Sequence, residues 1–250
     1  MKELTGQEKA NIAFWLYDLN LSLWPQRRKE VLELVLPRAE EGDAECCRYM
    51  GKVYINNCRI GEGGAEEARQ WMRKAVEKDS DALFSLGSIL EDPDEREQCY
   101  LRYLETFDDE KLAFYRISRE VLLEWLANRV ENNSSYTLDG KPDQTVAVRL
   151  WQRAIDGDSE SPEAHMYLGK AYLDGLGVEV DQQKAFYHIQ YAYEHRGAAS
   201  TTNSIWEEVP ELYARCLRLG LGTDPNGKTA GDVMGQFRED WDYLDDMLSR

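Results

Sequence analysis

The chain has 250 residues, and its 47 Asp and Glu residues outnumber its 30 Lys and Arg residues to give a formal net charge of −17. This balance argues against binding to nucleic acid or to an anionic membrane, since both require a basic protein surface. No apolar run approaches the ~20 residues of a membrane-spanning helix, and the N-terminal stretch lacks the apolar core of a secretory signal. We therefore expect a cytoplasmic protein.

The first 43 residues predict two capping helices. The first covers residues 5–19 and ends before Pro25, and the second covers residues 26–41, where Pro37 interrupts it. Terminal repeats of a repeat array face water on one side, so their helices are irregular. We therefore assign residues 1–43 to an N-terminal cap.

Two helix pairs follow, and each has a glycine in its first helix. Gly51 lies in ECCRYMG and Gly87 in DALFSLG, each shortly after an aromatic residue. Glycine in a helix interior costs about 1 kcal/mol relative to alanine, so its recurrence indicates that another helix approaches too closely for a Cβ atom. The glycine-rich stretch 61–64 is interpreted as the turn of the first pair, because no Lys-Ser pair or preceding strand supports a phosphate-binding loop.

An expanded repeat is predicted over residues 109–158. We expect a long helix over residues 109–131, a loop over residues 132–143 and a second helix over residues 145–157. In the long helix, Ala127 stands where the other repeats have glycine.

Residues 162–197 carry the clearest hairpin. Apolar residues recur at i, i+3, i+4, i+7 and i+8 in its first helix, which contains Gly169, and a second apolar stripe follows the predicted N-cap residue Asp181. Gly175 and Gly177 end the first helix, because glycine adopts the left-handed cap conformation without steric cost. One hairpin cannot bury both stripes, so neighbouring repeats must cover them.

The segment 199–250 predicts a degenerate C-terminal repeat followed by a capping helix. Residues 199–209 begin with small polar side chains and are expected to form a loose connection. A helix is predicted over residues 210–219, with Ala214 at the glycine position, and a last helix runs from about residue 231 to the end.

These motifs resemble the Sel-one-like repeat, a relative of the tetratricopeptide repeat that is common in bacteria. The residues of the best repeat that match the family pattern are Ala164, Leu168, Gly169, Tyr172, Gly175, Gly177, Val178, Asp181, Lys184 and Ala185. The resemblance is nearly complete in this repeat and loose over about residues 31–94, and the segment 109–143 departs from it. We assign residues 44–198 to the repeats. The resemblance implies a bacterial, all-α protein, an α-solenoid of stacked antiparallel helix hairpins in a right-handed superhelix, which acts by binding other proteins.

No catalytic, cofactor or metal site is predicted. His188 and His195 lie seven residues apart, two turns of one helix, rather than the four of a metal-binding pair, and His165 is expected to be a groove or packing residue. The cysteines match no ligand spacing and lack the regular pairing of some secreted relatives, so we expect them to be reduced. They are Cys46, Cys47, Cys58, Cys99 and Cys216.

A partner-binding groove is predicted on the first helices, at positions three before, one after and four after the packing glycine. The predicted groove residues are Arg48, Lys52, Phe84, Ser88, Met166, Lys170, Arg215 and Arg218. Its cations favour an acidic peptide held by charge-assisted hydrogen bonds, with Phe84 and Met166 contacting apolar side chains of the partner. Ordinary surface charge is the alternative interpretation.

The sequence thus predicts a non-enzymatic scaffold or adaptor that binds a protein or peptide. Two alternatives stay open. One is an immunity or inhibitor protein whose acidic surface binds a basic toxin. The other is an enzyme of unrecognised type, which would need titratable groups with shifted pKa values clustered in one pocket.

Overall fold

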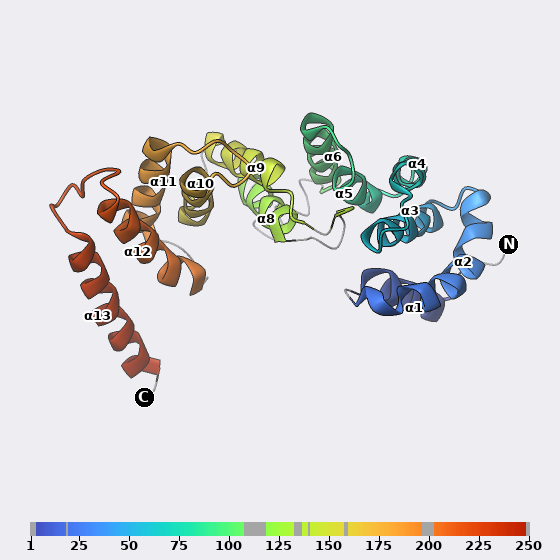
Figure 1. Ribbon diagram of the computed structural model, residues 1–250, viewed down its shortest axis with the longest axis horizontal. Coiled ribbons are helices and arrows are strands. Elements are labelled where there is room, and N and C mark those ends of the chain that lie inside the picture. The colour runs from blue at the N-terminus through green and yellow to red at the C-terminus, as the bar shows by residue number, and fades with distance from the viewer. Residues whose placement is uncertain are drawn as a thin grey trace. The chain divides into compact units, whose positions relative to one another are not determined.

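The computed structural model describes residues 4–18, 20–107, 119–132, 137–139, 141–157, 160–196 and 203–248. All regular structure in these ranges is helical (Figure 1), so the prediction of an all-α fold is confirmed. The helices are α1 Gly6–Tyr17, the 3-10 turn η1 Leu21–Leu23, α2 Trp24–Glu40, α3 Ala44–Arg59, α4 Ala65–Ala75, α5 Asp81–Gly87, α6 Pro93–Glu105, α8 Arg119–Asn132, α9 Gln144–Asp156, α10 Pro162–Asp174, α11 Gln182–His195, α12 Asn203–Arg218 and α13 Ala230–Leu248.

The chain forms two units, one of Met1–Ser118 with Trp125–Ala147 and one of Arg119–Glu124 with Val148–Arg250. In the first unit α3 packs on α4 and α5 on α6, and α1 and α2 pack on α3. In the second unit α10 packs on α11 and α12 on α13, and α10 and α11 both contact α12. Within each unit, helix hairpins are therefore stacked on one another, as the repeats predicted.

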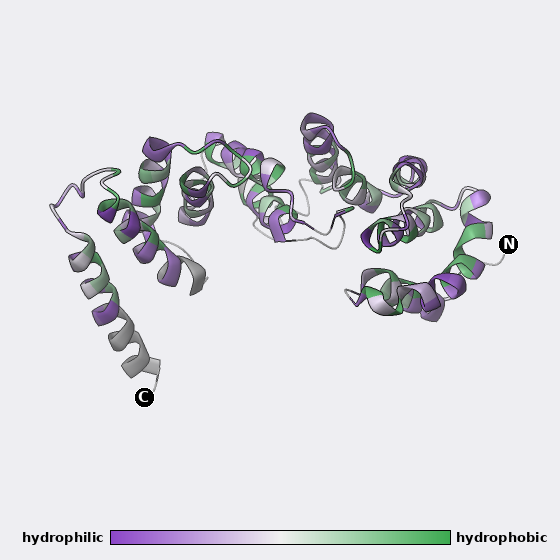
Figure 2. Cartoon of the chain, in the orientation of Figure 1, coloured by the Kyte–Doolittle hydropathy of each residue, from purple (hydrophilic) through white to green (hydrophobic). Residues whose placement is uncertain are grey.

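Local sequence chemistry explains where several helices begin and end. The side chain of Asp181 accepts a hydrogen bond from the backbone N–H of Lys184, which makes it the N-cap of α11 as expected. Gly175 ends α10 with a φ of 70°, in the left-handed region that favours glycine. Hydrophilic and hydrophobic residues occur together along the helices (Figure 2), as amphipathic elements require. Among the described residues, no helix combines the length and apolar character that crossing a membrane demands.

Three predicted helix boundaries are corrected by the structure. Pro25 lies in the first turn of α2 instead of before it, where its missing N–H costs nothing. Pro37 does not break α2, which continues to Glu40, so only one intrahelical hydrogen bond is lost close to the helix end. Residues 203–209 belong to α12, which contains Pro210 in its interior. The predicted helix over residues 109–131 appears as α8 from residue 119, and its earlier part lies outside the described residues.

The positions aligned by glycine lie at close helix contacts. A Cβ atom on Gly169 would lie 2.5 Å from Cγ1 of Ile189 and 3.0 Å from the backbone nitrogen of the same residue. A Cβ atom on Gly51 would meet the Met72 side chain, and one on Gly87, the last residue of α5, would meet the ring of Tyr100. The alanines at the corresponding positions of the other repeats are fully buried, and they are Ala127 and Ala214.

Candidate partner-binding surface

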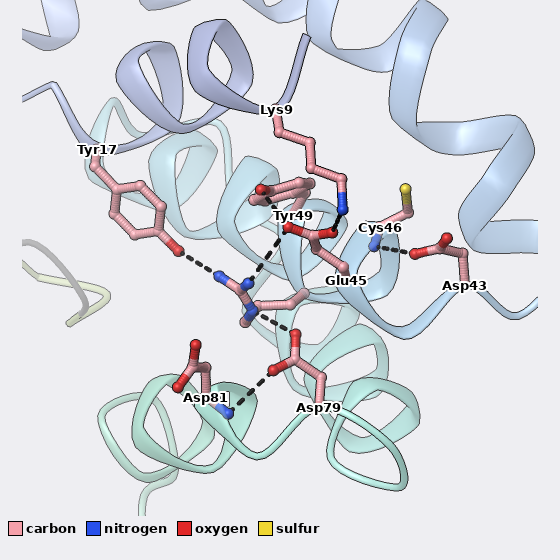
Figure 3. A network of polar contacts seen from close by, with 9 residues as sticks. Lys9, Tyr17, Asp43, Glu45, Cys46, Tyr49, Asp79 and Asp81 are labelled. Atoms are coloured by element: carbon pink, nitrogen blue, oxygen red, sulfur yellow. Dashed lines mark hydrogen bonds and ion pairs between the residues drawn. The ribbon is translucent and has the colours of Figure 1, made fainter. Parts of the chain in front are cut away.

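In the first unit, the side chain of Arg48 on α3 joins the end of α1 to the residues just before α5. Figure 3 labels residues of the surrounding polar network, among them Tyr17, Glu45 and Asp79. Nε of Arg48 donates to Oδ2 of Asp79 at 2.6 Å, just before α5, and its Nη1 donates to the hydroxyl of Tyr17 on α1 at 3.3 Å. Lys9, earlier on α1, forms an ion pair with Glu45, earlier on α3. The contacts follow the same order along both helices, so α1 and α3 run in the same direction, as first helices of stacked repeats do.

The pKa and the burial of Arg48 indicate a structural role. Burial opposes its charge, but Tyr17 and Asp79 outweigh that effect and raise the pKa of the guanidinium above its usual value. Only 15% of the side chain is exposed. Because its bonded neighbours belong to the same unit, we interpret Arg48 as holding the helices together.

Lys52 lies one turn beyond Arg48 on the same face of α3. Only 1% of its surface is exposed, and its Nζ lies 5.1 Å from the centre of the Tyr17 ring. Burial, with a smaller effect from the charge of Arg59, lowers the pKa of Lys52 to about 7. The expectation that Lys52 lines an open groove is therefore wrong, because the side chain presents no surface to a partner.

Phe84, Ser88 and Met166 are also buried, with 2%, 9% and 0% of their surface exposed. The ring of Phe84 lies 5.3 Å from that of Tyr100, and the Arg129 guanidinium lies over it at 4.2 Å. Helices α6 and α8 thus cover Phe84, which its position three residues before Gly87 predicted to be at the surface. For these three residues too, the predicted contact with a partner is corrected to packing inside the units.

In the second unit, two predicted cations lie where α10 meets α12. Nζ of Lys170 lies 3.3 Å from Oε1 of Glu208, and Nη2 of Arg215 lies 2.7 Å from Oδ1 of Asp174. The order of the pairs along the chain shows that α10 and α12 run in the same direction. The side chains of Lys170 and Arg215 are 35% and 45% exposed, so both remain accessible to solvent.

Arg218, the last predicted groove residue, is exposed and lines a pocket of about 870 Å³ between the end of α12, the loop 219–229 and the first turns of α13. We name it the α12–α13 pocket. Lys228 and Arg238 line it as well, together with Leu217 and Met234. Three cations therefore line one pocket in a chain whose net charge is strongly negative.

Sequence reasoning missed Lys228 and Arg238. Thr229 and Asp232 form a reciprocal capping pair, in which the backbone N–H of Asp232 donates to Oγ1 of Thr229 at 3.2 Å and that of Thr229 donates to Oδ2 of Asp232 at 2.8 Å. Recognising this T-x-x-D signature would have fixed the start of α13 directly after Lys228. No sequence pattern predicts that the loop 219–229 places the start of α13 close to Arg218.

The sequence also gave no indication that His165 and His188 meet. Their Nδ1 atoms lie 3.0 Å apart in a buried aromatic cluster, and the Tyr191 ring stacks on His165 at 3.9 Å. Burial lowers the pKa of each imidazole to about 4, helped by the neighbouring charges of His188 for His165 and of Lys184 for His188. Both rings are therefore neutral near pH 7. Among the described residues, no group of three or more His, Cys, Asp or Glu side chains could hold a metal ion.

Comparison with known proteins agrees with the repeat pattern. The Sel1 repeat family matches residues 44–80, 136–159 and 162–196. No curated protein sequence matches the chain.

Two solved structures are similar to the chain. A Sel1 repeat protein from Oxalobacter formigenes is 18% identical with a TM-score of 0.37, and the match covers 94% of this chain and 88% of that one. The protein c5321, a protective antigen present in uropathogenic Escherichia coli strains that displays an SLR fold, is 18% identical with a TM-score of 0.27. That match covers 80% of this chain and 49% of c5321. On the residues that the family matches, the chain carries Sel1 repeats.

Proposed function

We propose that the chain is a non-enzymatic scaffold that binds a peptide or protein partner through the solvent-accessible cations of α10 and α12. Sel1-repeat proteins generally mediate protein–protein interaction, and three segments of this chain match the repeat. The cations concerned are Lys170, Arg215 and Arg218.

The observation that carries this proposal is the accessibility of these cations. Lys170 and Arg215 bind carboxylates that are themselves 44% and 31% exposed. Exposed ion pairs contribute only about 0–1 kcal/mol, so a carboxylate of a partner can replace Glu208 at Lys170 at little cost. The pair of Arg215 with Asp174 has two hydrogen bonds, at 2.7 and 3.3 Å, and is the stronger of the two. Arg218 lies three residues after Arg215 on α12, and residues at that spacing are neighbours on a helix surface. The three side chains therefore offer an acidic partner several charge-assisted hydrogen bonds.

A site-specific cross-linking experiment tests the proposal. A photoreactive p-benzoylphenylalanine replaces Leu219, which is 57% exposed beside Arg218, and in a control chain replaces Phe14, which is 64% exposed on α1. After irradiation in an extract of the source cells, we expect a defined cross-linked partner at position 219 and not at position 14.

Charge-neutralising variants complete the experiment. Lys170→Gln with Arg215→Gln should abolish the cross-link at position 219, whereas Arg102→Gln, at an exposed site on α6, should leave it unchanged. A cross-link that persists in the double variant, or that forms equally at both positions, would contradict the assignment of the partner to α10 and α12.

A further inference from the structure

Resting on this proposed function, we propose that the α12–α13 pocket binds the carboxylate groups of an acidic peptide segment in the partner. Four features of the pocket carry the proposal. They are its cations, the state of its one carboxylate, the start of α13 and its apolar lining.

The charge of the pocket is opposite to that of the chain. Arg218, Lys228 and Arg238 line it, and Asp224 is the one acidic residue among its described lining residues. Arg218 and Arg238 are both exposed, and Nζ of Lys228 has a neutral hydrogen-bond partner, Oε1 of Gln236 at 2.8 Å. Guanidinium groups bind carboxylates with two parallel hydrogen bonds, so this set suits a carboxylate ligand.

The carboxylate of Asp224 accepts hydrogen bonds from the loop that follows it and from Tyr213. Its Oδ1 accepts the backbone N–H groups of Asn226 at 2.8 Å and Lys228 at 3.2 Å, and its Oδ2 accepts the hydroxyl of Tyr213 at 2.9 Å. Although burial opposes its charge, these hydrogen bonds and the charge of Lys228 keep the pKa of Asp224 below its usual value. Asp224 therefore fixes Lys228 at the pocket, and the described lining holds three cations and this one carboxylate. The carboxylate of Asp232 near Lys228 accepts the backbone N–H of Thr229.

The start of α13 adds donors to the same space. Thr229 is the N-cap and satisfies the N–H of Asp232, which leaves the amides of Ala230 and Gly231 in the first turn without intrahelical acceptors. Both residues line the pocket. The positive end of the helix dipole thus faces the same region as the three cations.

The remaining lining suits a peptide chain as well as a charge. Leu217 and Met234 supply apolar contacts, and Gly231 and Gly235 present no side chain. A Cβ atom on Gly235 would meet nothing within 4 Å, so the surface there is open. A volume of about 870 Å³ accommodates several residues of an extended peptide.

Fluorescence anisotropy with a fluorescein-labelled hexaglutamate peptide tests the proposal on the full chain. A chain of net charge −17 would repel this probe at most surfaces, so saturable binding at low salt indicates a localised basic site. We expect Arg218→Glu and Arg238→Glu each to weaken binding about tenfold or more, since a hydrogen bond to a charged group contributes about 1.5–3 kcal/mol. Arg102→Glu, with the same change of charge at an exposed site on α6, should change affinity less than about twofold.

Competition with inorganic phosphate separates a peptide site from a general anion site. We expect half-displacement of the hexaglutamate peptide only at phosphate concentrations far above the peptide Kd. Displacement by phosphate at concentrations near that Kd would overturn the assignment to peptide carboxylates. So would an absence of hexaglutamate binding, or equal binding by wild type and both pocket variants, with circular dichroism melts confirming that the variants are folded.

Failure here is distinguishable from failure of the proposed function. If the pocket variants bind hexaglutamate normally while Lys170→Gln with Arg215→Gln still abolishes the cross-link at position 219, the pocket assignment fails and the interaction function stands. If the cross-link never forms, the interaction function itself fails.

Discussion

Replacing Gly169 by alanine tests the close helix contact on which the second unit depends. The new Cβ atom would lie 2.5 Å from Cγ1 of Ile189, 3.0 Å from the backbone nitrogen of Ile189 and 3.3 Å from the carbonyl oxygen of Ala185. The side chain of Ile189 can rotate, but the two backbone atoms belong to α11 and can move only with that helix. The substitution therefore forces α10 and α11 apart.

The expected magnitude follows from two opposing effects. Alanine is favoured over glycine in a helix interior by about 1 kcal/mol. Overpacking of a well-packed contact costs typically 1–3 kcal/mol, and the backbone contacts at Gly169 place this site toward the upper end. We therefore expect Gly169→Ala to destabilise the protein by about 1–2 kcal/mol, and Gly169→Leu by roughly 3 kcal/mol, since its longer side chain enlarges the overlap.

Two other glycines provide matched controls on the same helix-propensity scale. At Gly51 the three nearest atoms to the new Cβ atom all belong to the side chain of Met72 and none to the backbone, so repacking of that side chain can relieve part of the overlap and the two effects should nearly cancel. At Gly235, inside α13, it would meet nothing within 4 Å, so alanine should stabilise the helix by up to about 1 kcal/mol.

Scanning calorimetry measures the three alanine variants beside wild type. A change of 1 kcal/mol shifts Tm by about 2–4 °C in a chain of this size. We expect Tm to fall for Gly169→Ala, to change little for Gly51→Ala and to rise for Gly235→Ala. If Gly169→Ala raises Tm as much as Gly235→Ala does, no close contact exists at Gly169 and the packing argument is refuted.

Two further predictions concern buried bases. The pKa of Lys52 is about 7 in the folded chain against an ordinary 10.5, so the unfolded chain binds more protons between these values and wild-type stability rises with pH across that range. Lys52→Met should remove this rise and stabilise the chain by a few kcal/mol below pH 7, since each unit of pKa shift corresponds to about 1.36 kcal/mol. Urea unfolding of wild type and variant at pH 6 and pH 10 measures the difference. His165 and His188 have folded pKa values of about 4 against 6.5, so wild-type stability is complete above pH 6.5 and falls as pH drops toward 4. His188→Gln should lessen that acid-induced loss in urea titrations, and an unchanged loss would show that the pair is not its source.

The sequence was sufficient for features that depend on a few neighbouring residues. The cap at Asp181 and the left-handed glycine at Gly175 follow from side-chain and backbone chemistry within one turn. The recurrence of Gly51 and Gly169 pointed to close contacts because glycine is costly in a helix. Pro37 and Pro210 show the limit of such local rules. Proline disfavours a helix interior, yet α2 and α12 continue past these residues in the folded chain.

The site could be predicted only in part, because exposure depends on what packs over a helix from elsewhere in the chain. Lys52 and Lys170 occupy equivalent positions, one residue after the packing glycine, and their sequences give no reason to treat them differently. Tyr17 of α1 covers Lys52, whereas Lys170 forms an ion pair with the partly exposed carboxylate of Glu208 and stays accessible. Such differences are set by a contact more than thirty residues away, which periodicity within one repeat does not encode.

The burial of the predicted groove positions, three before, one after and four after the packing glycine, changes how these positions are interpreted. Arg48 and Lys52 of α3 contact Tyr17 of α1 and are largely buried. Ile55 of α3 is fully buried, and on α10 Met166 and Leu173 are buried too. On α3 and α10 these positions are therefore mainly buried. On α12 the equivalent residues are exposed. Exposed side chains at these positions are accessible to a partner, and Arg218 also lines the α12–α13 pocket, which is why we place partner binding at α12 and the adjoining pocket. The residues exposed there are Glu211, Arg215 and Arg218.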